Sequence, residues 1–295
     1  YESPMYLTDK DILESVEGTL PMQASEAIKA LANQVDNDVL AEYKGVYGFS
    51  GTPGTTPFGS DLSDYTNART VLNRQLAPMG DRRVVLNPDA EGNALLLRAF
   101  QDASFGGGAG VIQEGQIGRK VGAEWWADQN MPSHTAGTAS GATTDTAGYA
   151  AGIKTITLAS AGTGSILVGD IITFAGHAQT YTVTSGDASV AGGGTVSFEP
   201  GLAVALAASA IAITLKASHA VNLIFHRDAI ALATRPLLDV DFSDRLVDMR
   251  SAVDPVSGLT LRLEVTREHK RWRWSYDILY GVRLVRAALC ARMAG

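Results

Sequence analysis

The chain of 295 residues has 45% hydrophobic residues, enough for one large domain or two smaller ones. Its formal net charge of -7 argues against a dedicated nucleic-acid binder, which usually presents a basic surface. No apolar run reaches the roughly 20 residues that a membrane-spanning helix needs, so we expect no membrane partner. The sequence begins without an initiator methionine, and we expect the gene product to extend beyond Tyr1.

Charge is distributed unevenly along the chain. The first 60 residues carry nine acidic residues and three lysines, whereas the last 51 carry ten basic residues and five acidic ones. Segments of opposite charge could pair within one subunit or between subunits. The sequence leaves both arrangements open.

Helix signals dominate residues 21–100. Apolar residues recur at three- and four-residue spacing from Ile28 to Val46, which predicts a helix over residues 21–46, about 37 Å long. A second helix is expected to begin at a Ser60 cap. Its predicted buried residues are Tyr65, Ala68, Leu72 and Leu76.

A buried strand and a third helix follow. The run Arg83-Val84-Val85-Leu86 indicates the strand. Asn87-Pro88-Asp89 then opens the helix, because proline favours the first turn. We expect Leu96 and Phe100 to lie inside.

Residues 137–218, called here the low-charge segment, differ sharply in composition from their flanks. They contain only six charged residues: Asp145, Lys154, Asp170, Asp187, Glu199 and Lys216. Five short strands are predicted, over residues 153–158, 170–174, 179–183, 195–198 and 210–215. Glycine and serine clusters separate them, a pattern typical of a small all-β barrel or sandwich. We expect an inserted domain that folds on its own.

The C-terminal segment predicts a long hairpin. Apolar residues alternate with polar ones from Leu259 to Val265, and a polar turn follows at residues 268–270. In the second strand, Trp272, Trp274, Tyr276 and Ile278 share one face. Arg271, Arg273, Ser275 and Asp277 are expected on the other.

The motifs that carry chemistry are missing or incomplete. The sequence has no P-loop, and we interpret Gly106–Gly110 as a flexible loop. Residues Gly48–Gly51 miss the nucleophile-elbow spacing by one position. Asp239, Asp241 and Asp244 could line a calcium loop, but a solvated turn is favoured because the glycine and distal glutamate are missing.

Histidine and cysteine give no metal site either. The histidines are His134, His177, His219, His226 and His269, and no two have the helical spacing of metal ligands. The single cysteine, Cys290, excludes a disulfide framework and lies in an apolar run. We interpret it as a core residue rather than a nucleophile.

The basic and aromatic run from Lys270 to Tyr276 is the one candidate for binding nucleic acid. Aromatic platforms flanked by arginine bind single strands by stacking. Strict alternation places the arginines and the aromatic rings on opposite faces, so a packed hairpin is favoured.

Several stretches, taken in chain order, carry a family resemblance. They are Leu31 to Asp36 in the long helix, Gly51 to Phe58 after it, Arg83 to Pro88, Gly115 to Arg119, Met131 to Gly137, Val168 to Gly176 and Asp228 to Ile230. In this order they resemble the major capsid proteins of tailed phages, the Hong Kong 97-type fold. Within that family, the chain is similar to coat proteins that carry an inserted domain.

The resemblance implies an α+β fold with a spine helix, a long β-hairpin, a central α/β domain and an inserted all-β, barrel-like domain. The division that it implies is a peripheral domain with the spine helix at 1–60, the first part of the central (axial) domain at 61–136, the inserted domain at 137–218, the second part of the central domain at 219–240, the peripheral hairpin at 241–285 and a C-terminal return to the central domain at 286–295. Family members also have an N-terminal arm and an extended loop before the spine helix. We expect both in the extension beyond Tyr1.

The function that the resemblance implies is an icosahedral shell around phage double-stranded DNA. Such a subunit has no catalytic residue, cofactor or metal, and we expect none here. The implied partners are many copies of the chain in hexamers and pentamers, portal and scaffolding proteins, and packaged DNA in weak, non-specific contact. The implied location is the virion, assembled in the host cytoplasm.

Two other classes of protein stay open. A β-rich surface or adhesion protein would account for the low-charge segment, but the helices ahead of it argue against this class. A nucleic-acid-binding module could use the arginine and tryptophan hairpin, but the net negative charge argues against that class.

Overall fold

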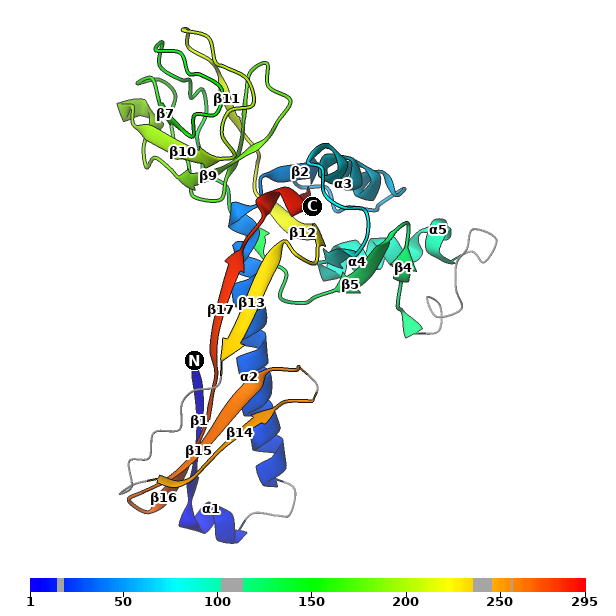
Figure 1. Ribbon diagram of the computed structural model, residues 1–295, viewed down its shortest axis with the longest axis vertical. Coiled ribbons are helices and arrows are strands. Elements are labelled where there is room, and N and C mark those ends of the chain that lie inside the picture. The colour runs from blue at the N-terminus through cyan, green and yellow to red at the C-terminus, as the bar shows by residue number, and fades with distance from the viewer. Residues whose placement is uncertain (15–18, 102–113, 236–245, 256) are drawn as a thin grey trace. The chain divides into compact units, whose positions relative to one another are not determined.

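A computed structural model of the chain describes residues 1–14, 19–101, 114–235, 246–255 and 257–295 (Figure 1). The expectations for Gly106–Gly110 and for the aspartates at 239, 241 and 244 lie outside these residues. The chain divides into two compact units. The first unit comprises Tyr1–Val39 and Ala231–Arg283, and the second comprises Leu40–Ile230 and Leu284–Gly295.

The first unit is built on a four-stranded antiparallel sheet. Its strand order is β1 (Glu2–Thr8), β16 (Arg271–Asp277), β15 (Thr260–Glu268) and β14 (Leu246–Val253). Strands β15 and β16 form a hairpin in which Leu263 lies opposite Tyr276. Lys270 closes its turn with a φ of 58°, in the left-handed region. The predicted hairpin is confirmed.

The first unit also holds α1 (Asp9–Glu14) and most of the long helix α2 (Thr19–Ala41). The helix begins two residues before the predicted range, and a 3₁₀ turn over Glu42–Gly45 replaces its expected last turn. Its 23 residues give a length of about 35 Å. Leu31 and Val35 of α2 form a buried cluster with Leu259, Leu261 and Ile278 of the hairpin region.

Charges from distant parts of the sequence meet in this unit. The carboxylate of Glu2 pairs with Arg273, and that of Asp9 lies 3.6 Å from Arg267. Strand β1 brings them together because it pairs with β16. The early acids and late arginines therefore pair, at least here, within one subunit.

The second unit is organised around a mixed sheet, called here the main sheet. Its strand order is β2 (Gly48–Gly51), β18 (Cys290–Ala294), β12 (His219–His226), β3 (Arg82–Leu86), β5 (Ala123–Ala127) and β4 (Gly118–Lys120), with β6 (Ser133–His134) also paired to β12. The β2–β18 and β3–β5 pairs are parallel and the others antiparallel. Strand β18 comes from the last residues of the sequence yet lies inside the sheet.

Helices α3 (Ser63–Arg74), α4 (Pro88–Leu96) and α5 (Arg98–Gln101) contribute to the core of this unit (Figure 1). Asn87 caps α4 by accepting a hydrogen bond from the amide of Ala90, and Pro88 occupies the first turn as predicted. The predicted Phe100 is buried, but Leu96 is 75% exposed. The expectation for Leu96 is wrong because the small residues Ala90 and Ala94 form the buried face of α4.

Helix α3 differs from its prediction at both ends. It begins at Ser63 rather than at a Ser60 cap, and the side chain of Asp61 accepts the Ser63 amide instead. Leu76 lies beyond the helix with a φ of 60° and is 89% exposed, because the chain turns away there. The three other predicted buried residues, Tyr65, Ala68 and Leu72, are fully covered.

Two leucines four residues apart give a direct test of this boundary. We expect Leu72→Ala to lower the free energy of unfolding by about 2–5 kcal/mol, because Leu72 is fully buried. Leu76→Ala should change it by less than about 0.5 kcal/mol, since Leu76 makes little contact. Urea unfolding of both variants measures the difference. Equal losses would contradict the helix end seen here.

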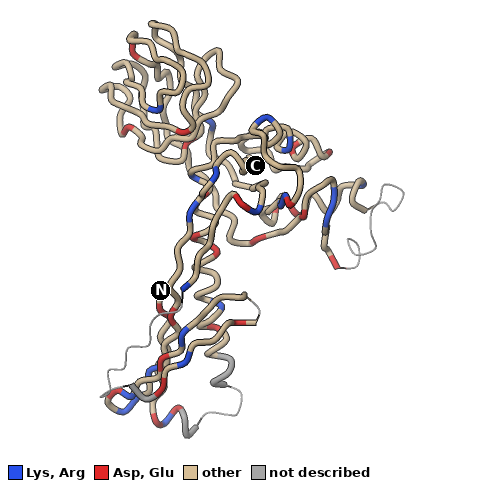
Figure 2. Tube along the Cα trace, in the orientation of Figure 1, with Lys and Arg blue, Asp and Glu red and all other residues tan. Residues whose placement is uncertain are grey.

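The low-charge segment forms a five-stranded antiparallel sheet in the second unit. Its order is β11 (Ile213–Leu215), β8 (Ile171–Phe174), β9 (Tyr181–Ser185), β10 (Thr195–Glu199) and β7 (Thr155–Thr157). All five predicted strands are confirmed, with shifted ends. Side chains between Ala142 and Ile213 form a separate hydrophobic cluster. Figure 2 shows how few charges this part of the chain carries.

A short connecting segment bridges the two edges of this sheet. Thr143 pairs with Ala212 beside β11, and Thr144 pairs with Leu158 beside β7. These two bridges connect the outer strands β11 and β7, so the sheet of the low-charge segment closes like a barrel. On β8, Ile172 and Phe174 point into its own cluster, whereas Ile171 contacts Phe49 and Ala294 of the main sheet. Both sides of β8 are therefore buried.

Candidate functional site

A fully buried arginine joins the low-charge segment to the main sheet. The guanidinium of Arg292 on β18 donates to the carbonyl oxygens of Val46 and Gly169, each at 2.9 Å. It also donates to the Lys44 carbonyl and to the Thr182 hydroxyl, each at 3.1 Å. Arg292 therefore binds three separate stretches of chain.

Burial lowers the pKa of Arg292 to about 10, so it stays charged at neutral pH. Its guanidinium lies 5.0 Å from the centre of the Tyr43 ring, a cation–π distance. Four oxygen acceptors and an aromatic face offset the cost of removing this charge from water. Neutral oxygen atoms and the Tyr43 ring therefore surround the buried charge of Arg292. None of the hydrogen bonds described for its guanidinium goes to a carboxylate.

A buried histidine and aspartate extend this network. Nε2 of His134 lies 3.0 Å from the Asp170 carboxylate, and Nδ1 lies 3.1 Å from the Tyr43 hydroxyl. The same carboxylate accepts the amide hydrogens of Gly137 and Leu167. We name this group, with Arg292 and Thr182, the buried junction. It ties the start of the low-charge segment to its middle.

Two histidines that are 85 positions apart in sequence meet beside the junction. His134 of β6 pairs with His219 of β12, and their ring centres are 5.2 Å apart. The search for helical histidine spacing missed this pair because strand pairing brings it together. Within the described ranges, no group of three or more His, Cys, Asp or Glu side chains is placed to hold a metal ion.

His219 makes this part of the structure sensitive to acid. Burial lowers the pKa of His219 from 6.5 to about 4, while the unfolded chain keeps the ordinary value. Between these two pH values the unfolded chain binds the proton and the folded chain does not. Stability is therefore expected to fall as the pH drops from about 6.5 to about 4.

The variant His219→Gln tests this dependence. The urea midpoint of the wild type should fall more steeply across that pH range than that of His219→Gln, which cannot titrate there. His269→Gln is the matched control, because His269 lies exposed in the hairpin turn. An unchanged slope in His219→Gln would contradict the assignment to His219.

Cys290 is fully buried, as the sequence indicated. Burial raises the pKa of its thiol to about 12, which leaves it protonated and unreactive at neutral pH. Residues Gly48–Gly51, which lack the nucleophile-elbow spacing, form strand β2. The side chains of the buried junction hold chain segments together through hydrogen bonds.

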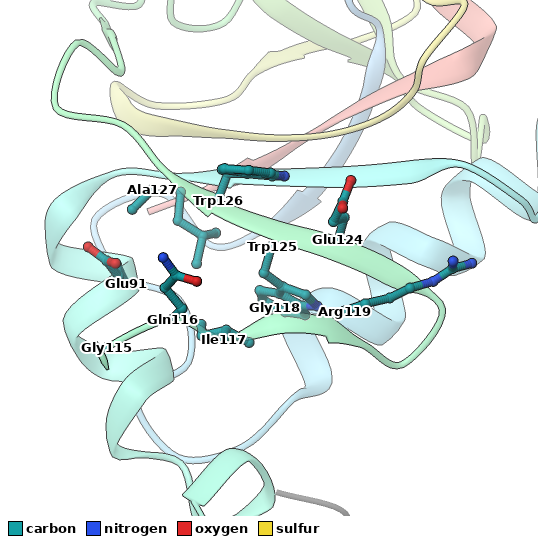
Figure 3. Close-up of a pocket in the computed structure, with 11 residues that line it drawn as sticks. Glu91, Gly115, Gln116, Ile117, Gly118, Arg119, Glu124, Trp125, Trp126 and Ala127 are labelled. Carbon is teal, nitrogen blue, oxygen red and sulfur yellow. The ribbon is translucent and has the colours of Figure 1, made fainter. Parts of the chain in front are cut away.

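A cavity of about 370 Å³ lies at the edge of the main sheet (Figure 3). The polar side chains that line it are Glu91, Gln116, Arg119 and Glu124, and its apolar lining includes Leu86, Ile117, Trp125 and Trp126. This lining brings no histidine, cysteine, serine or lysine together. The described part of the chain also contains no helix long and apolar enough to cross a membrane.

The strands beside β16 add contacts to the arginine and tryptophan hairpin. Alternation separates the arginines of β16 from its rings, while β15 brings an arginine to the ring face and β1 brings a ring to the arginine face. Arg267 of β15 lies 5.1 Å from the Trp272 ring, and Arg271 lies 4.6 Å from the ring of Tyr6 on β1. On the polar face, Ser275 and Asp277 are buried. The separation predicted within β16 is therefore confirmed, and the neighbouring strands add one arginine to the ring face and one ring to the arginine face.

No protein-family model and no curated protein sequence matches the chain. Solved structures do resemble it. The capsid structure of the cyanophage P-SCSP1u is 12% identical with a TM-score of 0.52, covering 100% of this chain and 71% of that chain. A structure of Mycobacterium phage Che8 is 14% identical with a TM-score of 0.46 and coverages of 99% and 69%. The bacteriophage PhiM1 mature capsid is 11% identical with a TM-score of 0.46 and coverages of 100% and 70%.

Of these three, the cyanophage structure is the one with a TM-score above 0.5, and we base the assignment of the fold on it. The likeness extends over the whole chain, although few residues are identical. The chain therefore has the mixed α+β fold of a phage capsid structure, as the resemblance predicted.

Proposed function

We propose that the chain is a major capsid protein that self-assembles into the icosahedral shell of a tailed phage, with the Hong Kong 97-type fold. The observation that carries this proposal is the fold shared with the cyanophage capsid structure across 100% of the chain. The buried junction supports it, because its residues hold segments together rather than react. In this role the protein is structural and not an enzyme.

Strands with one unpaired edge support assembly. In strand β13 (Ile230–Arg235), which pairs with β17 (Leu279–Leu284), five of six residues are exposed. Leu232 and Leu279 in this ribbon are each 45% exposed. Among the described residues, β1 and β14 are the outer strands of the four-stranded sheet. Such edges pair readily with other chains, and a shell would cover them.

The finer organisation is part of the proposal. The low-charge segment, 137–218, is the inserted domain, flanked by the central-domain parts 61–136 and 219–240. The peripheral domain combines 1–60 with the hairpin at 241–285, although the first compact unit of the chain ends at Val39 and resumes at Ala231. Residues 286–295 return to the central domain. The partners are other copies in hexamers and pentamers, portal and scaffolding proteins, and packaged double-stranded DNA. Assembly takes place in the host cytoplasm.

Assembly tests this proposal directly. We expect the protein, expressed with the scaffolding protein of its own phage, to sediment as megadalton particles that electron microscopy shows as closed shells. A stable monomer at high concentration would contradict the capsid function. Filaments formed only on added DNA would instead favour the nucleic-acid-binding alternative.

A further inference from the structure

One part of the main sheet is open on the side away from its helices. On β3 and β5, Val84 and Trp125 point into the buried core. The alternating neighbours Arg83, Glu124 and Trp126 point the other way, and Trp126 is 58% exposed. Figure 3 shows Glu124 and Trp126 on the same side of β5, opposite Trp125. Trp126 therefore presents a large ring to solvent.

Two arginines flank Glu124 in this open area. The strand register places Glu124 between Arg83 on β3 and Arg119 on β4. Arg83 lies 3.4 Å from Glu124, whereas Arg119 has no ion-pair or hydrogen-bond partner in the described part of the chain. A cleft of about 140 Å³ is lined by these residues and by Asp81, Arg82 and Arg227. The cleft thus offers the exposed guanidinium of Arg119 to an incoming acidic group.

We propose that this area, defined by Arg83, Arg119, Glu124 and Trp126 and called the tryptophan–arginine face, binds a second copy of the chain. The second copy presents one carboxylate to Arg119 and apolar surface to Trp126. The inference rests on the proposed capsid function and names a surface through which subunits meet. Tryptophan and arginine are the residue types that most often dominate binding energy at protein interfaces.

Charge complementarity favours a copy of this chain as the occupant. The chain carries 31 acidic against 24 basic residues, so its own surface offers carboxylates in excess. A guanidinium binds a carboxylate through paired, charge-assisted hydrogen bonds. Two of the other arginines around the cleft lie beside carboxylates, Arg83 beside Glu124 and Arg227 beside Asp228. Asp228 lies 3.6 Å from Arg227, and Arg82 donates to Asn73 and to two backbone carbonyls.

The same balance argues against a DNA backbone as the occupant. A polyanion is held by a continuous row of cations that replace its counterions. Here Asp81, Glu124 and Asp228 interrupt the arginines. A single acidic side chain fits the cleft better than a run of phosphates.

Oxidative footprinting of the full-length protein tests the proposal. Hydroxyl radicals should oxidise Trp126 in the unassembled subunit and leave it protected in empty, DNA-free particles. The exposed residue Met79 is the internal reference, being 66% exposed outside this face. Equal oxidation of Trp126 in subunit and particle would overturn the proposal. Protection only in DNA-filled particles would also overturn it, assigning the face to a polyanion.

Two matched pairs of variants complete the experiment. Trp126→Ala and Arg119→Gln are each expected to raise the critical concentration for assembly by roughly tenfold or more. The controls Met79→Ala and Arg74→Gln, at exposed positions elsewhere, should leave it unchanged. Circular dichroism of each subunit confirms that it folds.

The outcomes separate the two proposals. If the wild type forms no particles even with its scaffolding protein, both the capsid function and this interface are wrong. If the wild type and both face variants assemble equally, only the tryptophan–arginine face is wrong.

Discussion

Replacing Arg292 with methionine is expected to lower the free energy of unfolding of the subunit by about 3–5 kcal/mol. Methionine is similar in length but cannot donate hydrogen bonds. The carbonyl oxygens of Lys44, Val46 and Gly169 would then lose a buried donor. An acceptor left unsatisfied in the interior costs about 1–3 kcal/mol. The substitution should destabilise the low-charge segment as well as the main sheet, because Arg292 lies in the main sheet and binds Gly169 and Thr182.

Urea unfolding of the unassembled subunit measures this effect. Arg286→Met is the matched control, because Arg286 is exposed and should tolerate the change. Arg292→Lys keeps the charge but reaches fewer acceptors, so an intermediate loss is expected. Limited proteolysis should cut the 137–218 region faster in Arg292→Met. A loss below about 1 kcal/mol would show that the junction does not depend on this side chain.

Gly164→Ala is expected to be the most damaging single-methyl change in the low-charge segment. Gly164 has a φ of 86°, and an added Cβ would lie 2.3 Å from the carbonyl oxygen of Thr138. The left-handed backbone alone costs about 1–2 kcal/mol for a residue with a side chain. The backbone clash should add about 1–3 kcal/mol more.

Gly176→Ala separates these two contributions. Gly176 has the same φ of 86° but no atom within 4 Å of the added Cβ. It should therefore show only the conformational cost. Thermal unfolding of both variants gives the difference, which measures the close approach of the two chain segments. Equal losses for Gly164→Ala and Gly176→Ala would rule that approach out.

The sequence predicted local structure well where the pattern is local. The hairpin between Leu259 and Ile278 and the five strands of the low-charge segment follow from alternation and turn residues. The start of α4 at Asn87-Pro88-Asp89 follows from its neighbours in the chain. Two leucines predicted to be buried are exposed. Leu76 and Leu96 fit a helical pattern, but the chain turns away at one and small alanines form the core at the other.

The buried junction could not be predicted because its members are far apart in sequence. Arg292 gave no local signal that its guanidinium binds Lys44, Val46 and Gly169, more than a hundred positions away. The His134–His219 pair arises from strand pairing rather than from spacing along a helix. The sequence did indicate that Arg292 has buried partners, because an arginine within the apolar run Cys290–Ala294 is otherwise unusual. It did not indicate which groups those partners are.

The position of β18 has a consequence for synthesis on the ribosome. Strand β2 has β18 as its neighbour in the main sheet, and β12 lies on the other side of β18. Residues 290–294 are made more than 230 residues after β2. At about 5–20 residues per second, β2 waits roughly 10–50 seconds for its neighbour. During that interval a chaperone or another nascent chain can occupy its edge. A chain that ends before Cys290 would lack both β18 and Arg292, and such a chain should be degraded rather than built into larger structures.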